Sequence, residues 1–297
     1  MYMRISTIYT VIAANFKIWW FKLIRRTDKL RPYKMLINLT NACQSRCDFC
    51  DIWQIDSKSP DLKAKEINID HIRSLLTDLK DDIVWLALSG GEVTLVPYFK
   101  EMMTMAKEIC PKLKIITFTT NALAVKKVYE YADHVKSLGI DSFINISLDG
   151  DEKIHDQLRG VPGNYRKCLE VHKGLKERGI QSHFGLTVGA KNYDFLKNEY
   201  KKWNKDIKAI TFVHSGGIYG KENAEDNKII FEGMREVYKH YVLDSFSEII
   251  EKIHIKVGLF FIQNKMKKDI IPCEVMHSTV HIMPYGEIQP CMFYCHG

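Results

Sequence analysis

The sequence predicts an α/β protein built around a sheet of parallel strands. Six short apolar segments alternate with segments of helical periodicity, at intervals of roughly 30–35 residues. The apolar segments show little alternation of apolar and polar residues, which is typical of parallel strands covered on both faces. Six such units are too few for a closed eight-stranded barrel. A doubly wound sheet and an open, partial barrel both remain.

The first element expected is a helix within residues 1–30. Its apolar residues recur on one face: Ile5, Ile8, Tyr9, Ile12, Phe16, Trp19 and Leu23. Asn15 and Lys17 interrupt the apolar run, so the segment is too broken to span a bilayer, and no signal-peptide cleavage site follows. The helix lies in a membrane interface, or it packs on the protein's own body or on a partner. We expect a cytoplasmic protein, peripheral to the inner face of the membrane under the first interpretation.

Residues 31–222 hold the six strand–helix units. The expected strands are 35–40, 83–89, 113–120, 142–148, 182–188 and 209–214, and the expected helices are 69–79, 98–109, 124–138, 164–178 and 193–205. Residues 223–297 form a third region, which begins with one long helix near 222–253. In parallel α/β folds the active site lies at the carboxyl ends of the strands, so the loops that follow the strands are the place to look for chemistry.

The composition fits a soluble globular protein. Hydrophobic residues make up 46% and charged residues 27% of the 297 residues, enough for a sizeable core. The formal net charge of +7 would suit an anionic partner, but the chain has no short basic block of the nucleic-acid-binding kind. We therefore expect no nucleic acid partner.

The eight cysteines fall mostly in two clusters, one near each end of the chain. Disulfide frameworks are typical of small secreted domains, so clusters in a chain of this size indicate metal or iron–sulfur sites in a reducing compartment. Cys110 and Cys168 lie in helical patterns and are interpreted as buried residues without a ligand role.

The first cluster, Cys43, Cys47 and Cys50, lies in the segment TNACQSRCDFC, directly after the first expected strand. Zinc with a distant fourth ligand is one interpretation, because a closed structural zinc site takes four protein ligands. A cubane iron–sulfur cluster is the other, because such clusters are also held by thiolates. Three thiolates leave one iron of a cubane open to a substrate, and a structural site gains nothing from that vacancy.

The spacing Cys43-x3-Cys47-x2-Cys50, with an aromatic residue before the last cysteine, resembles the signature of the radical S-adenosylmethionine (radical SAM) enzymes. Three further segments resemble motifs of that family in the same order: LALSGGEVTL at 86–95, TFTTNAL at 117–123 and ISLDGDEKIHDQLRGVPGNY at 146–165. The resemblance covers about residues 35–214. It implies a partial (β/α)6 parallel barrel.

The resemblance also implies cofactors and roles. A [4Fe-4S] cluster on the three cysteines would bind S-adenosylmethionine (SAM) at its open iron, and a one-electron donor such as flavodoxin or ferredoxin would reduce it. Phe49 would pack near the adenine, and Gly90 and Gly91 would bring backbone close to the methionine moiety. Glu92 would lie near the SAM amino group, although Val93 replaces the proline usual after this glutamate. Four residues at strand ends would bind the ribose or the methionine carboxylate, or serve the scaffold: Asn121, Ser147, Asp149 and Arg159.

The second cluster, Cys273, Cys291 and Cys295, resembles the opening of the auxiliary-cluster domains called SPASM or, when shortened, twitch. A β-hairpin with Gly286 at positive φ is expected between the first two of these cysteines. Full SPASM domains carry more cysteines, so we expect one auxiliary iron–sulfur cluster at most. Its fourth ligand would be water, the substrate or a nearby side chain: His277, His281 or His296.

Two other classes stay open. An iron–sulfur electron-transfer or redox-sensing protein would never cleave SAM and would have no need of the segment SGGEVTL. A zinc-stabilised binding module would be colourless, whereas an iron–sulfur protein is brown. Within the radical SAM interpretation, relatives with SPASM domains favour a peptide or protein substrate. The amphipathic N-terminal helix favours a lipid or lipid-linked one.

Overall fold

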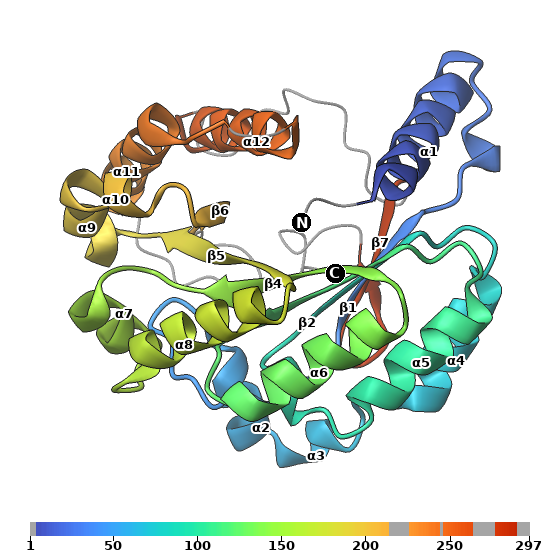
Figure 1. Ribbon diagram of the computed structural model, residues 1–297, viewed down its shortest axis with the longest axis horizontal. Helices are drawn as coiled ribbons and strands as arrows, with labels where there is room; N and C mark the ends of the chain where they lie inside the picture. The colour runs from blue at the N-terminus through green and yellow to red at the C-terminus, as the bar shows by residue number, and fades with distance from the viewer. Residues whose placement is uncertain (1–3, 214–225, 244–245, 264–276, 290–297) are drawn as a thin grey trace.

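An eight-stranded sheet runs through the part of the chain that the structure describes, which is residues 4–213, 226–243, 246–263 and 277–289 (Figure 1). In this computed structural model the strand order is β6-β5-β4-β3-β2-β1-β7-β8. The strands are β1 (Lys34–Asn38), β2 (Trp85–Ser89), β3 (Ile115–Thr120), β4 (Asp141–Ser147), β5 (Gln181–Val188), β6 (Ile207–Phe212), β7 (Thr279–Ile282) and β8 (Ile288–Gln289). Every pair from β1 to β6 is parallel, which confirms the predicted sheet.

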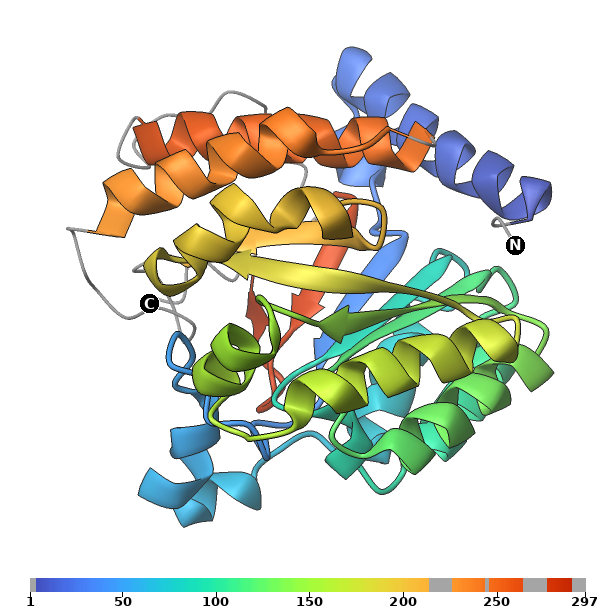
Figure 2. The ribbon, with the colours of Figure 1, turned by 60° about the vertical axis from the view of Figure 1, so that its left-hand side comes forward.

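Helices cover the outer face of this sheet, which curves as an open, partial barrel rather than a doubly wound layer (Figures 1 and 2). The helices between the first strands are α2 (Ile52–Lys58), α3 (Pro60–Lys63), α4 (Ile69–Asp78), α5 (Phe99–Ile109), α6 (Val125–Ser137), α7 (Glu152–Arg159) and α8 (Asn164–Glu177). Later come α9 (Tyr193–Asn198) and α10 (Tyr200–Trp203), with short 3-10 turns η1 (Thr27–Lys29), η2 (Val93–Leu95) and η3 (Ala190–Asn192). The doubly wound alternative is therefore wrong.

Alternate residues of each strand serve the two faces of the sheet. Ile144, Ile146 and Phe184 are at most 1% exposed because they point outward and pack under the helices. The intervening residues, such as Asn145 and His183, are only half-buried. The inner face of the barrel is therefore more polar and more accessible than the outer face.

The region after β6 differs from the sequence expectation. The single long helix predicted near 222–253 is wrong: two helices, α11 (Asp226–His240) and α12 (Phe246–Gln263), stand in its place. The side-chain amide of Asn204 donates to the carbonyl oxygen of His240, the last residue of α11, at 2.8 Å. This bond replaces the one that a further turn of helix would supply to that carbonyl. The hydroxyl of the buried Tyr241 donates to the carbonyl of Lys208, so the chain is tied to β6 at the break.

The predicted C-terminal hairpin is present as β7 and β8, which pair antiparallel, and Gly286 has a φ of 87° in its turn. β7 also pairs parallel with β1, so the hairpin continues the barrel sheet rather than standing apart from it. Cys273, Cys291, Cys295 and His296 lie outside the described residues.

The predicted N-terminal helix is α1 (Ile5–Leu23), and it docks at the amino ends of the strands. The Thr7 hydroxyl donates to the carboxylate of Asp141, the first residue of β4, at 2.6 Å. Asn15 donates to the hydroxyl of Tyr33, just before β1, at 3.0 Å. Within the described ranges, no helix has both the length and the hydropathy needed to cross a bilayer.

Candidate active site at the cysteine loop

The loop after β1 brings Cys43, Cys47 and Cys50 together at the carboxyl edge of the sheet. Cys47 is buried, Cys43 and Cys50 are half-buried, and all three are free thiols. Burial, with a smaller contribution from the neighbouring cysteine thiolates, raises the pKa of Cys43 to about 11 and that of Cys50 to about 12. Burial thus favours the neutral thiols, and bound iron would favour the thiolate forms.

The turn after β2 holds this loop through backbone contacts. The amide of Gly91 donates to the carbonyl of Thr40 at 2.6 Å, and the amide of Glu92 donates to the carbonyl of Ala42 at 2.8 Å. A Cβ on Gly90 would lie 2.6 Å from the Thr40 oxygen, and one on Gly91 would lie 2.2 Å from the Ala42 oxygen. Both glycines are therefore required because backbone passes directly against them, and that backbone belongs to the cysteine loop. Their contact with a methionine moiety stays a prediction.

Glu92 is 1% exposed and sits at the centre of a ring of donors. One carboxylate oxygen accepts from the Thr94 amide, the Thr94 hydroxyl and the Thr120 hydroxyl, and the other accepts from the Asn121 amide at 2.8 Å. Burial raises the pKa of Glu92, while the hydrogen bonds oppose that shift. The side chain joins the ends of β2 and β3 behind the loop, and its predicted proximity to the SAM amino group is untested.

Asn121, at the end of β3, reaches into the cysteine loop. Its side-chain amide donates to the Ser45 hydroxyl at 3.0 Å and to Gln44 at 3.2 Å, and it lies 3.8 Å from the Cys43 sulfur. Its side-chain oxygen accepts from the Leu123 amide. Asn121 thus positions the first half of the loop, which is the scaffold role that the sequence left open; its contact with the ribose or the methionine carboxylate stays a prediction.

The end of α7 holds the second half of the loop. The Arg46 amide donates to the carbonyl of Arg159 at 2.8 Å, and the Asp48 amide donates to that of Leu158 at 3.0 Å. Gly160 ends the helix in the left-handed region, with φ of 64°, and a Cβ there would lie 2.8 Å from the Arg46 Cβ. The approach of the two segments therefore depends on glycine.

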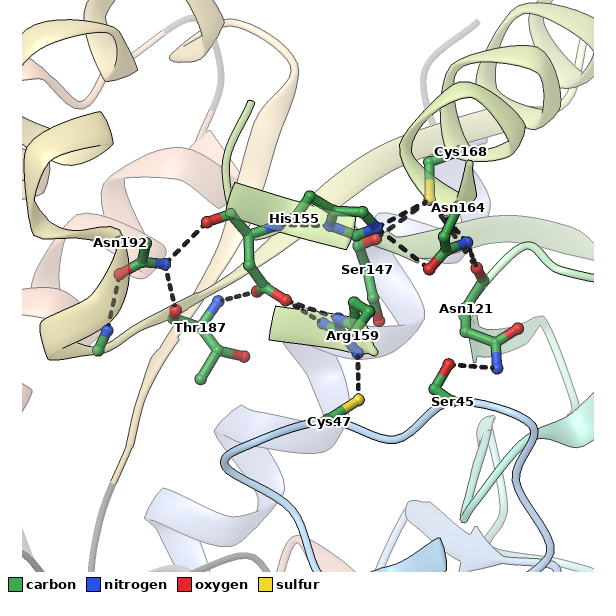
Figure 3. Close-up of polar contacts among 12 residues, drawn as sticks. Ser45, Cys47, Asn121, Ser147, His155, Arg159, Asn164, Cys168, Thr187 and Asn192 are labelled. Carbon is green, nitrogen blue, oxygen red and sulfur yellow. Dashed lines mark hydrogen bonds and ion pairs between the residues drawn. The ribbon is translucent and has the colours of Figure 1, made fainter. Parts of the chain in front are cut away.

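Arg159 links the loop to the barrel strands (Figure 3). Its guanidinium makes two contacts of 2.6 Å with the carboxylate of Asp149, donates to the Cys47 sulfur at 3.7 Å and lies 5.3 Å from the ring centre of Phe49. Burial alone would lower the pKa of Arg159, but the charges of Asp149 and Cys47 raise it above its usual value. A permanent cation thus faces a cysteine sulfur, and Phe49 lies against that cation.

Asp149 is fully buried just past the end of β4. Its second carboxylate oxygen accepts from the Thr187 amide in β5 at 2.9 Å, and its carbonyl accepts from the Asn192 side chain at 2.9 Å (Figure 3). These bonds hold Asp149 in place, and its carboxylate in turn positions the guanidinium of Arg159. Both residues therefore serve the scaffold in this structure, and direct SAM binding by either stays a prediction.

A second buried network was not predicted from the sequence (Figure 3). The Asp149 amide donates to His155 Nδ1 at 3.1 Å, and His155 Nε2 donates to the Asn164 side-chain oxygen at 3.1 Å. Burial lowers the pKa of His155 to about 4, so the ring is neutral at pH 7. The Cys168 thiol donates to the Ser147 carbonyl at 3.4 Å and is fully buried, as expected of a residue without a ligand role. His155 and Asn164 lie in the segment HDQLRGVPGN, whose motif was the only sequence signal for them.

The donor set at the loop fits an iron–sulfur cubane. Among the described residues, no three His, Cys, Asp or Glu side chains converge closely enough to share one metal ion. A cubane needs no such convergence, because each thiolate binds a different iron. Arg159 and Asn121 point N–H groups at two of the three sulfurs, which suits an anionic cluster. His281, on β7, accepts instead from the side chain of Asn38 at 3.1 Å.

A family model described as the Radical SAM superfamily matches residues 37–195, more than half of the chain. The antilisterial bacteriocin subtilosin biosynthesis protein AlbA of Bacillus subtilis (strain 168) is 22% identical over 274 residues, which cover 89% of this chain and 55% of AlbA. The sporulation killing factor maturation protein SkfB of the same strain is 28% identical over 168 residues, 56% of this chain and 38% of SkfB. The chain thus spans about half or less of the length of these relatives.

A solved structure of native anSMEcpe with bound AdoMet has a similar fold. Its TM-score is 0.60 at 15% sequence identity, and the alignment covers 89% of this chain and 76% of that one. At this identity the similarity is evidence for the partial barrel alone.

Proposed function

This chain belongs to the radical SAM superfamily, and from that premise we propose that it cleaves SAM reductively and abstracts hydrogen from a substrate. Cys43, Cys47 and Cys50 would hold a [4Fe-4S] cluster with one open iron. The observation that carries the proposal is the cysteine loop at the carboxyl edge, held on one side by the Gly-Gly-Glu turn and on the other by Arg159. A pure electron carrier is not favoured, since it needs no SAM-binding edge.

When bound, the cluster supplies the electron that breaks the S–C5′ bond of SAM, giving methionine and a 5′-deoxyadenosyl radical that takes a hydrogen atom from the substrate. The chain's own residues orient the parts. Arg159 and Asn121 hold the two halves of the loop, and the buried carboxylate of Glu92 joins the ends of β2 and β3 behind it. We propose Phe49, Gly90, Gly91, Glu92, Asn121, Ser147, Asp149 and Arg159 as the surroundings of SAM, by direct contact or by positioning the loop.

The inner face of the barrel offers a place for the substrate. Asn145 and His183 on the inner face are only half-buried. Polar, partly accessible side chains of this kind would suit a substrate that brings hydrogen-bonding groups, such as a peptide backbone. The bacteriocin and killing-factor relatives support the same class, so we propose a peptide or protein substrate ahead of a lipid-linked one.

We further propose an auxiliary iron–sulfur cluster in the region 223–297, held by Cys273, Cys291 and Cys295. Two cubanes would give about eight irons per chain, and the variant Cys43→Ala, Cys47→Ala, Cys50→Ala would keep about half of them. Loss of all iron in that variant would show that the C-terminal cysteines hold no cluster of their own. We propose a flavodoxin or ferredoxin as the electron donor. We propose that the protein is located in the cytoplasm, at the inner face of a membrane.

The test of the proposed function is anaerobic reconstitution with iron and sulfide, followed by electron paramagnetic resonance of the reduced protein. We expect a brown protein whose signal changes when SAM is added, because SAM binds the open iron directly. A colourless protein containing zinc would support the binding-module alternative. A brown protein whose electron paramagnetic resonance signal does not change on addition of SAM would instead support an electron carrier.

A further inference from the structure

The apolar face of α1 points away from the barrel. The large side chains on this face are 38–69% exposed: Ile8, Tyr9, Ile12, Phe16, Trp19 and Leu23. The sequence left open whether the helix packs on the protein's own body. It does pack on the barrel, but this apolar stripe is not the face that packs there. The opposite face docks instead, with Thr7 and Ile18 at most 6% exposed. The helix is therefore attached to the barrel without burying Tyr9, Phe16 or Trp19.

The charge of this segment identifies what would cover the exposed face. Residues 1–27 contain five Lys or Arg residues and no Asp or Glu. All four of Arg4, Lys17, Arg25 and Arg26 are exposed; Arg4 also pairs with Asp141, and Arg26 with Asp28. A helix with Trp and Phe on one face and basic residues around it matches a surface of anionic lipid headgroups over acyl chains. A protein partner would not require this absence of acidic residues.

We propose that the exposed face of α1 docks the protein on an anionic lipid bilayer, with the cysteine loop directed away from the membrane. The helix contacts Asp141 and Tyr33 at the amino ends of β4 and β1, whereas the cysteine loop follows the carboxyl end of β1. In Figures 1 and 2, α1 lies at the opposite end of the molecule from α2 and α3, which follow the cysteine loop.

This orientation bears on the substrate, and that consequence rests on the proposed function. A site at the far end of the barrel is open to the aqueous side rather than to the bilayer. A peptide can reach it from solution, whereas a lipid would have to leave the membrane and pass around the barrel. The N-terminal helix therefore does not favour a lipid substrate, even though it favours a membrane.

Vesicle co-sedimentation tests the docking. We expect the wild type to bind vesicles of equal parts phosphatidylglycerol and phosphatidylcholine, and to bind phosphatidylcholine vesicles much less. Phe16→Ser with Trp19→Ser should lower binding at least about tenfold, and Lys17→Ser should lower it about fivefold. The matched control is Ile229→Ser with Leu243→Ser, which removes two exposed apolar side chains elsewhere and should leave binding unchanged.

The Phe16 and Trp19 variant should also melt at the wild-type temperature, because both side chains are more than half exposed. A wild type that ignores anionic vesicles overturns the proposal. If it is instead a dimer by light scattering and the variant is a monomer, a second copy of the chain covers the face. Binding that survives in the variant overturns the proposal as well.

Brominated lipids test the orientation. Quenching of tryptophan fluorescence on vesicle binding should be lost in Trp19→Phe with Trp20→Phe and kept in Trp53→Phe, since Trp53 lies in α2 beside the cysteine loop. The reverse pattern would place the cysteine loop on the bilayer and overturn the orientation. SAM cleavage is measured in parallel without lipid. A protein that binds vesicles but cannot cleave SAM refutes the proposed function alone, and one that cleaves SAM but ignores vesicles refutes the docking alone.

Discussion

Replacing Asp149 with Asn should destabilise the whole site, because Arg159 depends on that carboxylate for its charge balance. Asp149 is fully buried, and the Arg159 side chain is 10% exposed. The Asn side chain can still accept from the Thr187 amide, but it offers an amide or a neutral oxygen to a guanidinium that now has no counter-ion. Removing one partner of a buried ion pair costs about 3–5 kcal/mol of unfolding free energy.

Urea unfolding of the metal-free protein under reducing conditions measures this cost. Glu177→Gln is the matched control, because it breaks a pair with Lys173 whose side chains are 63% and 80% exposed and should change stability by at most about 1 kcal/mol. The double change Asp149→Leu with Arg159→Met should recover part of the loss, since it leaves no unpaired buried charge. A value for Asp149→Asn within about 1 kcal/mol of the wild type would refute the assignment of Arg159 as a buried, carboxylate-dependent cation.

Three further changes test neighbouring parts of the site. Glu92→Gln introduces an amide donor among groups that already donate. The free energy of unfolding, measured by urea denaturation, should therefore fall by about 1–3 kcal/mol. An unchanged value would contradict the donor ring around Glu92. Gly91→Ala places a Cβ against the Ala42 carbonyl, so the reconstituted protein should hold less iron at the first site; Gly189→Ala, whose Cβ would meet only a side-chain methyl group, should match the wild type. His155 has a folded pKa of about 4, below the unfolded value of about 6.5, so the unfolded state takes up the proton first as pH falls. The free energy of unfolding should therefore fall by about 3 kcal/mol between pH 6.5 and 4. In His155→Gln the free energy of unfolding should change less over this pH range. An equally steep fall in the variant would contradict a buried, neutral ring.

The strands were predictable from the sequence because their outward residues are continuously apolar. Ile144, Ile146 and Phe184 pack under the helices, and that burial leaves a pattern which a single chain shows. The break between α11 and α12 was not predictable in this way, because it depends on Asn204 and Tyr241 contacting segments about 33 to 36 residues away. Tertiary contacts of that kind leave no local periodicity.

The three thiols of the candidate site were predictable from spacing, but the roles of their neighbours were not. For Arg159 and Asn121 the sequence left contact with SAM and a scaffold role both open; in the structure they hold the cysteine loop itself, and contact with SAM stays a prediction. His155 and Asn164 were missed because a buried histidine looks the same in sequence whether it is a ligand or a satisfied core residue. For α1, the periodicity identified the apolar face but not the side on which the barrel lies.

Formation of 5′-deoxyadenosine from SAM tests the central claim most directly. The reconstituted wild type, supplied with a one-electron reductant under anaerobic conditions, should produce it, and Cys43→Ala, Cys47→Ala, Cys50→Ala should produce none. Cys110→Ala is the control, because that thiol is buried against the carbonyl of Leu76 and away from the loop, and it should retain wild-type activity. Equal amounts of 5′-deoxyadenosine from the wild type and the triple variant would contradict the account.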